Sequence, residues 1–202
     1  MSIGVASVVV MVSMGQGAQK HILDMIHDMG TNLIVVNAGQ VTLVGGRERQ
    51  AAVVTTLRPA DVTAIAEQVV SVADAAPETS RRMNVRWESE NMNTEIVGVT
   101  PAAFSIRKIE IKTGRIFNSF ENDSAQRVAV IGSVIAEILF REENPVGHQI
   151  RIGLAPFEVV GVMTAKGLDA TGVDRDDRIL ISLETFMRRL ERTFYIQKIH
   201  IQ

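Results

Sequence analysis

Cysteine is absent from the 202 residues of this chain, which excludes disulfide bonds, thiolate catalysis and cysteine-ligated metal sites. Aromatic residues are scarce at 4%, so aliphatic packing must supply most of the burial energy. Neither sign of charge dominates, because the net charge is −2 and the basic residues are spread along the sequence. We therefore expect no nucleic-acid partner, since phosphates call for a clustered basic face.

Apolar residues are what the chain has in quantity. They make up 46% of it, enough for one sizeable core or two small ones. Residues 3–14 are an almost unbroken apolar run, and no charge appears before Lys20. Residues 15–29 are amphipathic with helical spacing, and Gly30 ends them as a helix C-cap glycine does.

Two interpretations of this opening compete. In one, Gly15-Gln16-Gly17 is the phosphate-binding turn of a dinucleotide-binding βαβ unit in a nucleotide-dependent α/β enzyme. That fingerprint requires a third glycine at the position of Lys20 and an acidic residue at the position of Asn37. In the other, residues 3–29 form one helix. Because a membrane span needs about 20 apolar residues, residues 1–15 would then be the end of a transmembrane helix.

The remaining chain changes its pattern twice. A strand is predicted at 31–37 and a loop at 38–56. A helix is predicted from Pro59, and an extended segment at 70–75 is closed by Pro77. A mostly β middle follows, with a hairpin at 83–99, a strand at 128–131, a helix at 134–140, and strands at 148–152 and 157–163. The end is strand, then a helix at 183–190 capped by Ser182, then strand. We therefore expect an α+β fold: both chain ends, residues 16–79 and 178–202, form one α/β subdomain, and residues 80–177 are a β-rich insertion.

Two groups of ionisable residues raise the question of metal binding. His21, Asp24, His27 and Asp28 lie on the first helix, where His21 with Asp24 or Asp24 with Asp28 could share a face. A metal site needs a third converging ligand, so a solvated helix surface is favoured. Asp174-Arg175-Asp176-Asp177 lacks the glycine and the distal glutamate of an EF-hand. Its carboxylates are better explained as loop anchors or caps.

Other single residues carry weaker signals. Ser133 after Gly132 stands between a strand and a helix, but the Gly-x-Ser-x-Gly pattern is missing and an N-cap serine is favoured. His148 and His200 lie on predicted strands without a visible partner. Trp87 is interpreted as a core or inter-subdomain contact, and an exposed binding anchor stays open. Because nothing assembles a nucleophile, a base and an oxyanion site, we assign no catalytic, cofactor-binding or metal-binding residue.

An ordered series of short motifs resembles one known family over nearly the whole chain. The motifs are Ile3-Gly4-Val5-Ala6-Ser7-Val8-Val9, Gly15-Gln16-Gly17-Ala18-Gln19, Met29-Gly30-Thr31-Asn32-Leu33-Ile34, Val130-Ile131-Gly132-Ser133, Asn144-Pro145-Val146-Gly147, Ile150-Arg151-Ile152, Phe157-Glu158-Val159-Val160-Gly161-Val162 and Asp174-Arg175-Asp176-Asp177-Arg178. Together they resemble the end of the first membrane helix and the periplasmic domain of MacB-type (FtsX-like) ABC transporter permeases. Arg58 departs from the small hydroxyl residue expected at that helix start.

This resemblance implies a porter-like α/β subdomain and an inserted, β-rich sabre-like subdomain, placed in the periplasm by a bacterial inner-membrane protein. It implies a non-catalytic domain without cofactors, which transmits ATP-driven conformational change (mechanotransmission) for efflux of antibiotics, peptides or toxins. The chain has no P-loop, so the ATPase would lie elsewhere. Implied partners are a second permease copy, a nucleotide-binding domain, a periplasmic adaptor, an outer-membrane channel, and the membrane through residues 1–15.

Three alternatives stay open: the nucleotide-dependent enzyme, a lipoprotein-export or peptide-sensing relative of the same superfamily, and a free-standing periplasmic binding module with no ATPase. The predicted loops at 38–56 and 164–177 are the candidates for partner contact, since binding residues are frequent on loops.

Overall fold

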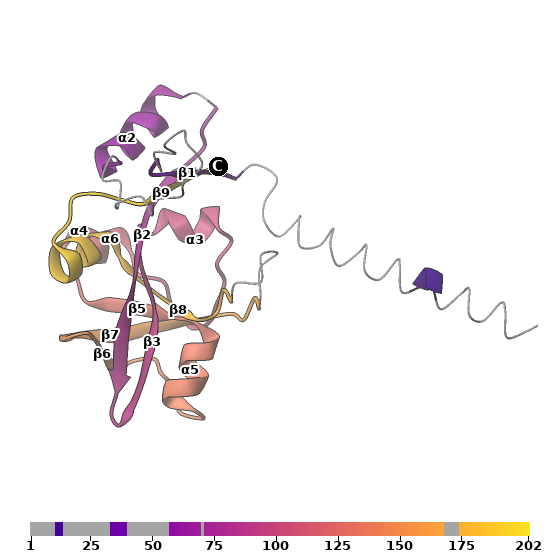
Figure 1. The fold of residues 1–202 in the computed structure, drawn as a ribbon, viewed down its shortest axis with the longest axis vertical. Helices are drawn as coiled ribbons and strands as arrows, with labels where there is room; N and C mark the ends of the chain where they lie inside the picture. The colour runs from indigo at the N-terminus through magenta and orange to yellow at the C-terminus, as the bar shows by residue number, and fades with distance from the viewer. Residues whose placement is uncertain (1–10, 14–32, 40–56, 70, 168–173) are drawn as a thin grey trace, which may run out of the picture. The chain divides into compact units, whose positions relative to one another are not determined.

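The computed structural model describes residues 11–13, 33–39, 57–69, 71–167 and 174–202. The chain divides into two units, Met1–Leu33 and Ile34–Gln202, and the second holds almost all of the described residues (Figure 1). Residues 11–13 are helical. No helix within the described ranges is long and apolar enough to span a bilayer. The rest of the predicted helix over residues 3–29 lies outside them, as does Gly15-Gln16-Gly17.

The second unit has the expected α+β composition, with short helices beside one nine-stranded sheet. Its elements are β1 (Ile34–Asn37), α2 (Pro59–Gln68), β2 (Ala75–Trp87), β3 (Glu90–Val99), α3 (Ala102–Ile106), β4 (Ile111–Gly114), α4 (Ser119–Asp123), β5 (Val128–Ile131), α5 (Ser133–Phe140), β6 (Gln149–Ile152), β7 (Ala155–Met163), β8 (Arg178–Ser182), α6 (Leu183–Thr185), the π-helix η1 (Phe186–Glu191) and β9 (Lys198–Ile201).

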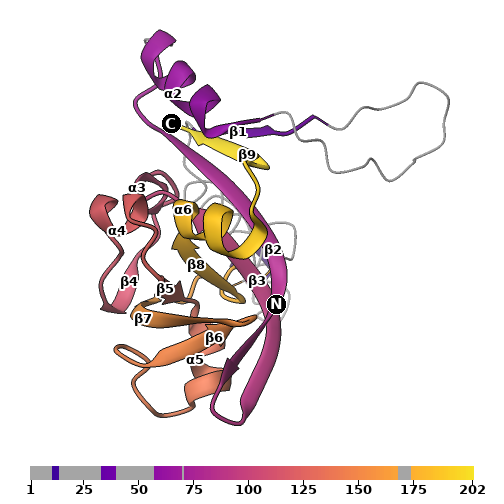
Figure 2. The ribbon, with the colours of Figure 1, turned by 90° about the vertical axis from the view of Figure 1, so that its left-hand side faces the viewer.

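One end of this unit is a split βαβ arrangement. Strands β1 and β2, connected through α2, both pair with β9, which lies antiparallel between them (Figure 2). The first and last strands of the unit are therefore neighbours. Val62 of α2 packs with Ile196, Ile199 and Ile201 in a small hydrophobic cluster beneath the helix.

The other end is a closed ring of strands. Following the hydrogen-bonded pairs, β2 leads to β3, β8, β5, β7 and β6, and β6 returns to β2; we call these six strands the ring. Ring side chains from alternate positions share one core with α5, including Val85, Ile96, Ile131, Ile152 and Phe157, each 0% exposed. Burying each such side chain contributes about 1.5–3 kcal/mol. Within the ring each strand has a partner on both sides, whereas β1 and β4 lie outside it as the two end strands of the sheet.

Strand β2 belongs to both ends, and this corrects the prediction that Pro77 closes an extended segment at 70–75. The strand starts at Ala75 and continues through Pro77 to Trp87. The carbonyl of Glu78 accepts a hydrogen bond from the Gln197 amide, so the main-chain groups of Pro77 point away from β9, toward the β3 side. On that side β3 begins to pair only at Glu78. The missing N–H of proline is therefore harmless there.

Two helices also differ from expectation. Asn118 and Glu121 form a capping box that starts α4, a helix the sequence analysis missed although the signal was present. Ser182 does cap the helix predicted at 183–190, accepting from Thr185 N at 3.3 Å. That helix changes to a π-helix at Phe186. How the chain divides into residues 16–79 with 178–202 and residues 80–177 stays a prediction.

Candidate functional site

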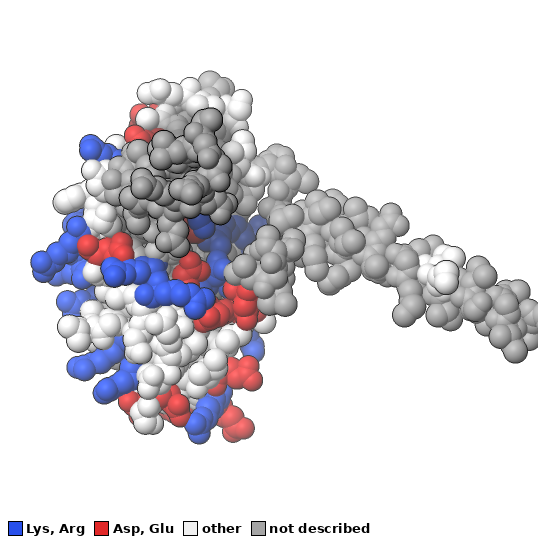
Figure 3. All heavy atoms as spheres, in the orientation of Figure 1, with Lys and Arg blue, Asp and Glu red and all other residues white. Residues whose placement is uncertain are grey.

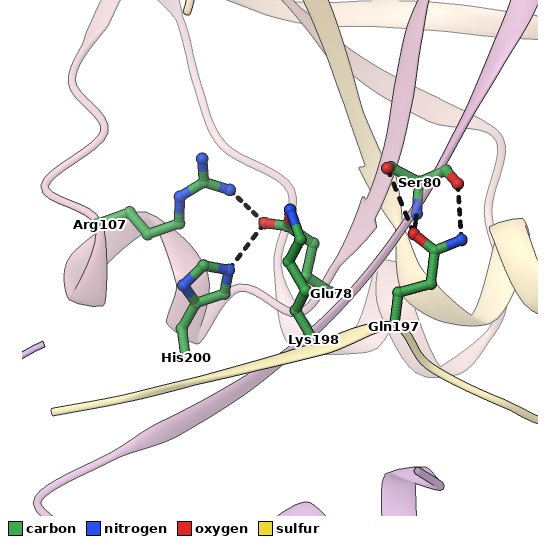
Figure 4. A network of polar contacts seen from close by, with 6 residues as sticks. All are labelled: Glu78, Ser80, Arg107, Gln197, Lys198 and His200. Carbon is green, nitrogen blue, oxygen red and sulfur yellow. Dashed lines mark hydrogen bonds and ion pairs between the residues drawn. The ribbon is translucent and has the colours of Figure 1, made fainter. Parts of the chain in front are cut away.

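A buried carboxylate lies where the split βαβ end meets the ring. Glu78 on β2 is 5% exposed, and three basic side chains point at its carboxylate (Figure 4). His200 Nε2 of β9 lies 3.0 Å from Glu78 Oε2, and the Arg107 guanidinium donates to the same oxygen. Lys198 Nζ lies 3.6 Å from Oε1. We call these four residues the Glu78 cluster.

Strand register explains why these groups converge. Lys198 stands directly opposite Glu78 in the β2–β9 pair, and His200 follows two residues later on the same face of β9. Arg107 comes from a different element, because it is the C-cap residue of α3. One carboxylate therefore joins two strands and a helix that are distant in sequence.

The electrostatics keep Glu78 charged. Burial by itself raises the pKa of Glu78, but the hydrogen bond from His200 and the charges of Arg107, His200 and Lys198 outweigh it and hold the pKa at about 2. Burial lowers the pKa of the Arg107 guanidinium from its usual value, and the charge of Glu78 opposes that effect. At neutral pH the cluster is thus an ionised carboxylate held by the charges of Arg107 and Lys198 and hydrogen-bonded to the His200 ring.

A neutral contact extends the cluster along the same strand pair. The Gln197 side chain donates to the Ser80 carbonyl at 3.0 Å and accepts from the Ser80 amide at 3.2 Å (Figure 4). Its main-chain amide donates to the Glu78 carbonyl at 3.0 Å. The start of β9 is therefore fixed to the middle of β2 by main-chain and side-chain bonds together.

The chemistry available to this cluster is structural. Both oxygens of Glu78 face cations, and among the described residues no serine or threonine hydroxyl is hydrogen-bonded to them. Breaking a buried ion pair by removing one partner is strongly destabilising, because it leaves an uncompensated charge. We therefore interpret the Glu78 cluster as a joint that fixes α3 and β9 to β2.

The acidic loop predicted to anchor main chain does so. Asp176 is 5% exposed and accepts hydrogen bonds from the amides of Lys166, at 3.0 and 3.1 Å, and Gly167, at 2.8 Å. Asp177 accepts from the Thr94 hydroxyl at 2.6 Å. No group of three or more metal-ligating side chains is found in the part of the chain that the structure describes.

Ser133 does not cap its helix, contrary to the prediction. Helix α5 begins at Ser133, and Gly132 is the N-cap residue. A Cβ atom at Gly132 would overlap the main-chain oxygen of Asp176, and the Gly132 amide donates to the Arg178 carbonyl at 2.9 Å. Close packing against β8 and its preceding loop therefore requires glycine at the position where a serine cap would stand.

Both histidines predicted on strands have partners that the sequence did not reveal, and His148 lies just before β6 and not within it. His200 belongs to the Glu78 cluster, and His148 lies 3.6 Å from Glu143. The Trp87 ring is 4.3 Å from that of Phe140 and 5.9 Å from that of His148, measured between centroids. Trp87 is thus a core contact to α5, one of the two interpretations left open.

The remaining candidates fall outside the described residues: His21, Asp24, His27 and Asp28, with most of the predicted loop at 38–56. Glu78 and Arg107 were missed by the sequence analysis. A single acid in an alternating strand has no local signature, since its partners lie up to 122 residues away.

Comparisons with known proteins place the chain among transporter domains. A family model described as the MacB-like periplasmic core domain matches residues 1–202. The chain is 38% identical over 200 residues to the macrolide export ATP-binding/permease protein MacB of Bdellovibrio bacteriovorus, and 35% identical over 199 residues to that of Rhodospirillum rubrum. These alignments cover 99% and 98% of this chain but 30% of each relative.

Solved structures agree on the fold. The periplasmic region of MacB from Actinobacillus actinomycetemcomitans superposes with a TM-score of 0.75 at 20% identity, covering 90% of this chain and 79% of that one. The extracellular domain of the noncanonic ABC-type transporter YknZ from Gram-positive bacteria gives a TM-score of 0.68 at 17% identity, covering 85% and 83%. At such identities the likeness shows the fold alone.

Proposed function

This chain belongs to the family of MacB-like periplasmic core domains, and from that premise we propose that it transmits ATP-driven conformational change within an ABC transporter permease to the periplasm. The observation that carries the proposal is the family match over the full 202 residues. Curated relatives are macrolide export ATP-binding/permease proteins, so macrolide antibiotics are the substrate class to test first.

The chain spans about 30% of the length of those relatives, so ATP hydrolysis is assigned to another part of the assembly. We propose that this domain is itself non-catalytic and uses no cofactor. Its partners in this proposal are a second permease copy, a nucleotide-binding domain, a periplasmic adaptor and an outer-membrane channel, with the membrane reached through residues 1–15. Lipoprotein export and peptide sensing remain alternatives that use the same domain.

The architecture suits a domain that moves as a rigid body. Strand β2 extends for 13 residues from the split βαβ end into the ring (Figure 2). The Glu78 cluster fixes β9 and α3 to it at the junction. Because β2 belongs to both ends, a movement applied to β1 or β9 can pass through this junction to the ring, and a rigid joint there favours rigid-body transmission.

The test uses the full-length permease that carries this domain, with its nucleotide-binding domain and adaptor, in an efflux-deficient Gram-negative strain. We expect the wild type to raise the minimum inhibitory concentration of erythromycin. Glu78→Gln should reduce this concentration at least fourfold while membrane vesicles keep their ATPase activity. His200→Gln is a milder variant of the same joint, because glutamine can still donate to Glu78.

Glu184→Gln is the matched control, since Glu184 pairs with Arg188 on the surface at 2.7 Å. It should leave resistance unchanged, and membrane levels of each variant are measured by immunoblot. If the wild type confers no macrolide resistance, macrolide export is the wrong substrate assignment. If Glu78→Gln and His200→Gln both transport normally, the Glu78 cluster has no part in transmission.

A further inference from the structure

Two arginines stand side by side on the outer wall of the ring. Arg86 of β2 is directly opposite Arg151 of β6, and the neighbouring pair in the same ladder is Val85 with Ile152. Val85 and Ile152 are fully buried in the core. Because side chains alternate across a strand, Arg86 and Arg151 both point outward, and both are exposed.

This pair is unusual for the described surface. Several arginines elsewhere have acidic partners, such as Arg141 with Glu90 at 2.6 Å and Arg188 with Glu184 at 2.7 Å, and Arg86 with Arg151 places two like charges directly opposite each other. On the face drawn in Figure 3, basic and acidic side chains are intermixed. Neither the Arg86 nor the Arg151 guanidinium makes a hydrogen bond or ion pair with any residue that the structure describes. Like charges directly opposite in a sheet are destabilising, so the pair contributes nothing to the fold that would explain it.

The surroundings add hydrogen-bonding groups and one apolar anchor. Asn91 of β3 stands opposite Arg86, and Asn93 stands opposite Asn84. Next to them is the two-residue turn between β6 and β7, whose Gly153 amide donates to the Asn84 carbonyl at 2.9 Å. Leu154 in this turn is 98% exposed, at a position where short hairpins usually carry small polar residues.

The acids on this wall lie to the sides of the arginine pair. Glu95 stands opposite Arg82 and Arg178, and Glu158 stands opposite Gln149. The two unpaired guanidinium groups, with amide side chains and an exposed leucine beside them, are thus left to a group from outside the chain. Arginine is enriched at interface hot spots, and its planar fork matches a carboxylate with two parallel hydrogen bonds.

We propose that this surface, Asn84, Arg86, Asn91, Arg151 and Leu154, docks an acidic segment of a partner protein. Carboxylates of the segment accept from Arg86 and Arg151, its polar groups bond the asparagines, and an apolar side chain covers Leu154. A protein is favoured over a lipid surface because amide side chains that both donate and accept match a polypeptide, whereas one leucine offers little apolar area for insertion. The proposal goes beyond the transport function and does not depend on which substrate is exported.

The test titrates the 202-residue chain into a fluorescein-labelled octapeptide of alternating glutamate and leucine at low salt. Binding is measured by the fluorescence anisotropy of the peptide. The same peptide with glutamine in place of glutamate is the uncharged control. We expect binding of the acidic peptide only. The double variant Arg86→Gln/Arg151→Gln should weaken it at least tenfold, and Leu154→Ser at least threefold.

The matched control is Arg127→Gln/Arg189→Gln, which removes the same charge from two exposed arginines without ion pairs to described residues. It should change the affinity less than twofold. Thermal unfolding checks the fold, and Arg86→Gln/Arg151→Gln should melt at or above the wild-type temperature because a repulsion is removed.

Three results would overturn the proposal: no binding of the acidic peptide up to 1 mM, equal losses in both double variants, or binding of vesicles with about 30% phosphatidylglycerol through Arg86 and Arg151 in place of the peptide. The last result would assign the surface to a membrane. None of them bears on the erythromycin test, so the two proposals fail separately.

Discussion

Replacing Glu78 by glutamine should lower the free energy of unfolding of the domain by about 3 kcal/mol at neutral pH. The pKa of Glu78 is held at about 2 against an ordinary value of 4.5, and that interval, at about 1.4 kcal/mol per pH unit, corresponds to about 3 kcal/mol. The Glu78 side chain is 6% exposed and that of Arg107 19%, so solvent screens the interaction little. Leaving a buried cation unpaired costs about 3–5 kcal/mol, which agrees.

The sign of the pH dependence follows from the direction of the pKa. A carboxylate whose pKa is lowered by folding contributes stability that is complete above its unfolded pKa and is lost as the pH falls toward its folded pKa. The difference in unfolding free energy between wild type and Glu78→Gln should therefore be full at pH 7 and shrink from about pH 4.5 toward pH 2. Urea unfolding at pH 7, 5.5, 4.5 and 3.5, followed by circular dichroism, measures it, and other carboxylates cancel in the difference.

Two further variants make this experiment decisive. Glu184→Gln removes a surface pair whose Arg188 side chain is 63% exposed, and it should cost less than about 1 kcal/mol. Glu78→Gln/Arg107→Gln should recover part of the loss, because the arginine charge is removed as well. A difference below about 1 kcal/mol at pH 7, or one that stays constant down to pH 3.5, would refute the assignment of Glu78 as an ionised, buried joint.

The packing of α5 and the acidic loop gives two more predictions. Gly132→Ala should lower the free energy of unfolding by about 3 kcal/mol, because the added Cβ overlaps the Asp176 main chain. Gly39→Ala is the control, since Gly39 has open space around it, and it should unfold at the wild-type urea midpoint. Equal midpoints for the two variants would contradict this packing. Asp176→Ala should cost about 2 kcal/mol, because the amides of Lys166 and Gly167 lose their acceptor. A rise in the wild-type melting temperature with added calcium would show that this carboxylate serves a metal and not the loop.

Family and fold class could be read from the sequence, because both depend on local patterns. The ordered motifs from Val130-Ile131-Gly132-Ser133 to Asp174-Arg175-Asp176-Asp177-Arg178 identified the family, which the comparisons confirm. Alternation at 83–87 and the apolar run at 157–163 predicted strands that the structure contains. These signals arise within a few residues, where backbone geometry alone sets which side chains share a face.

Local rules failed where a neighbour from elsewhere in the chain decided the outcome. The sequence predicts a strand end at Pro77, but β3 pairs with β2 only from Glu78 onward, so no main-chain hydrogen bond is lost at the proline. The sequence predicts Ser133 as a helix cap, but the N-cap residue is Gly132, where the Asp176 main chain lies too close for any side chain. In both places the neighbour that decides the local structure is too distant in sequence for a local pattern to include it.

The candidate joint and the candidate docking surface were both beyond the sequence. Glu78 and His200 meet across 122 residues, and Arg86 becomes the neighbour of Arg151 only because two residue pairs close the ring between β2 and β6. Local periodicity determined which residues face the core. Which distant strands pair, and in which register, was decided by the tertiary structure, because that choice is set by the total apolar burial and polar satisfaction of the whole unit, which no short segment contains.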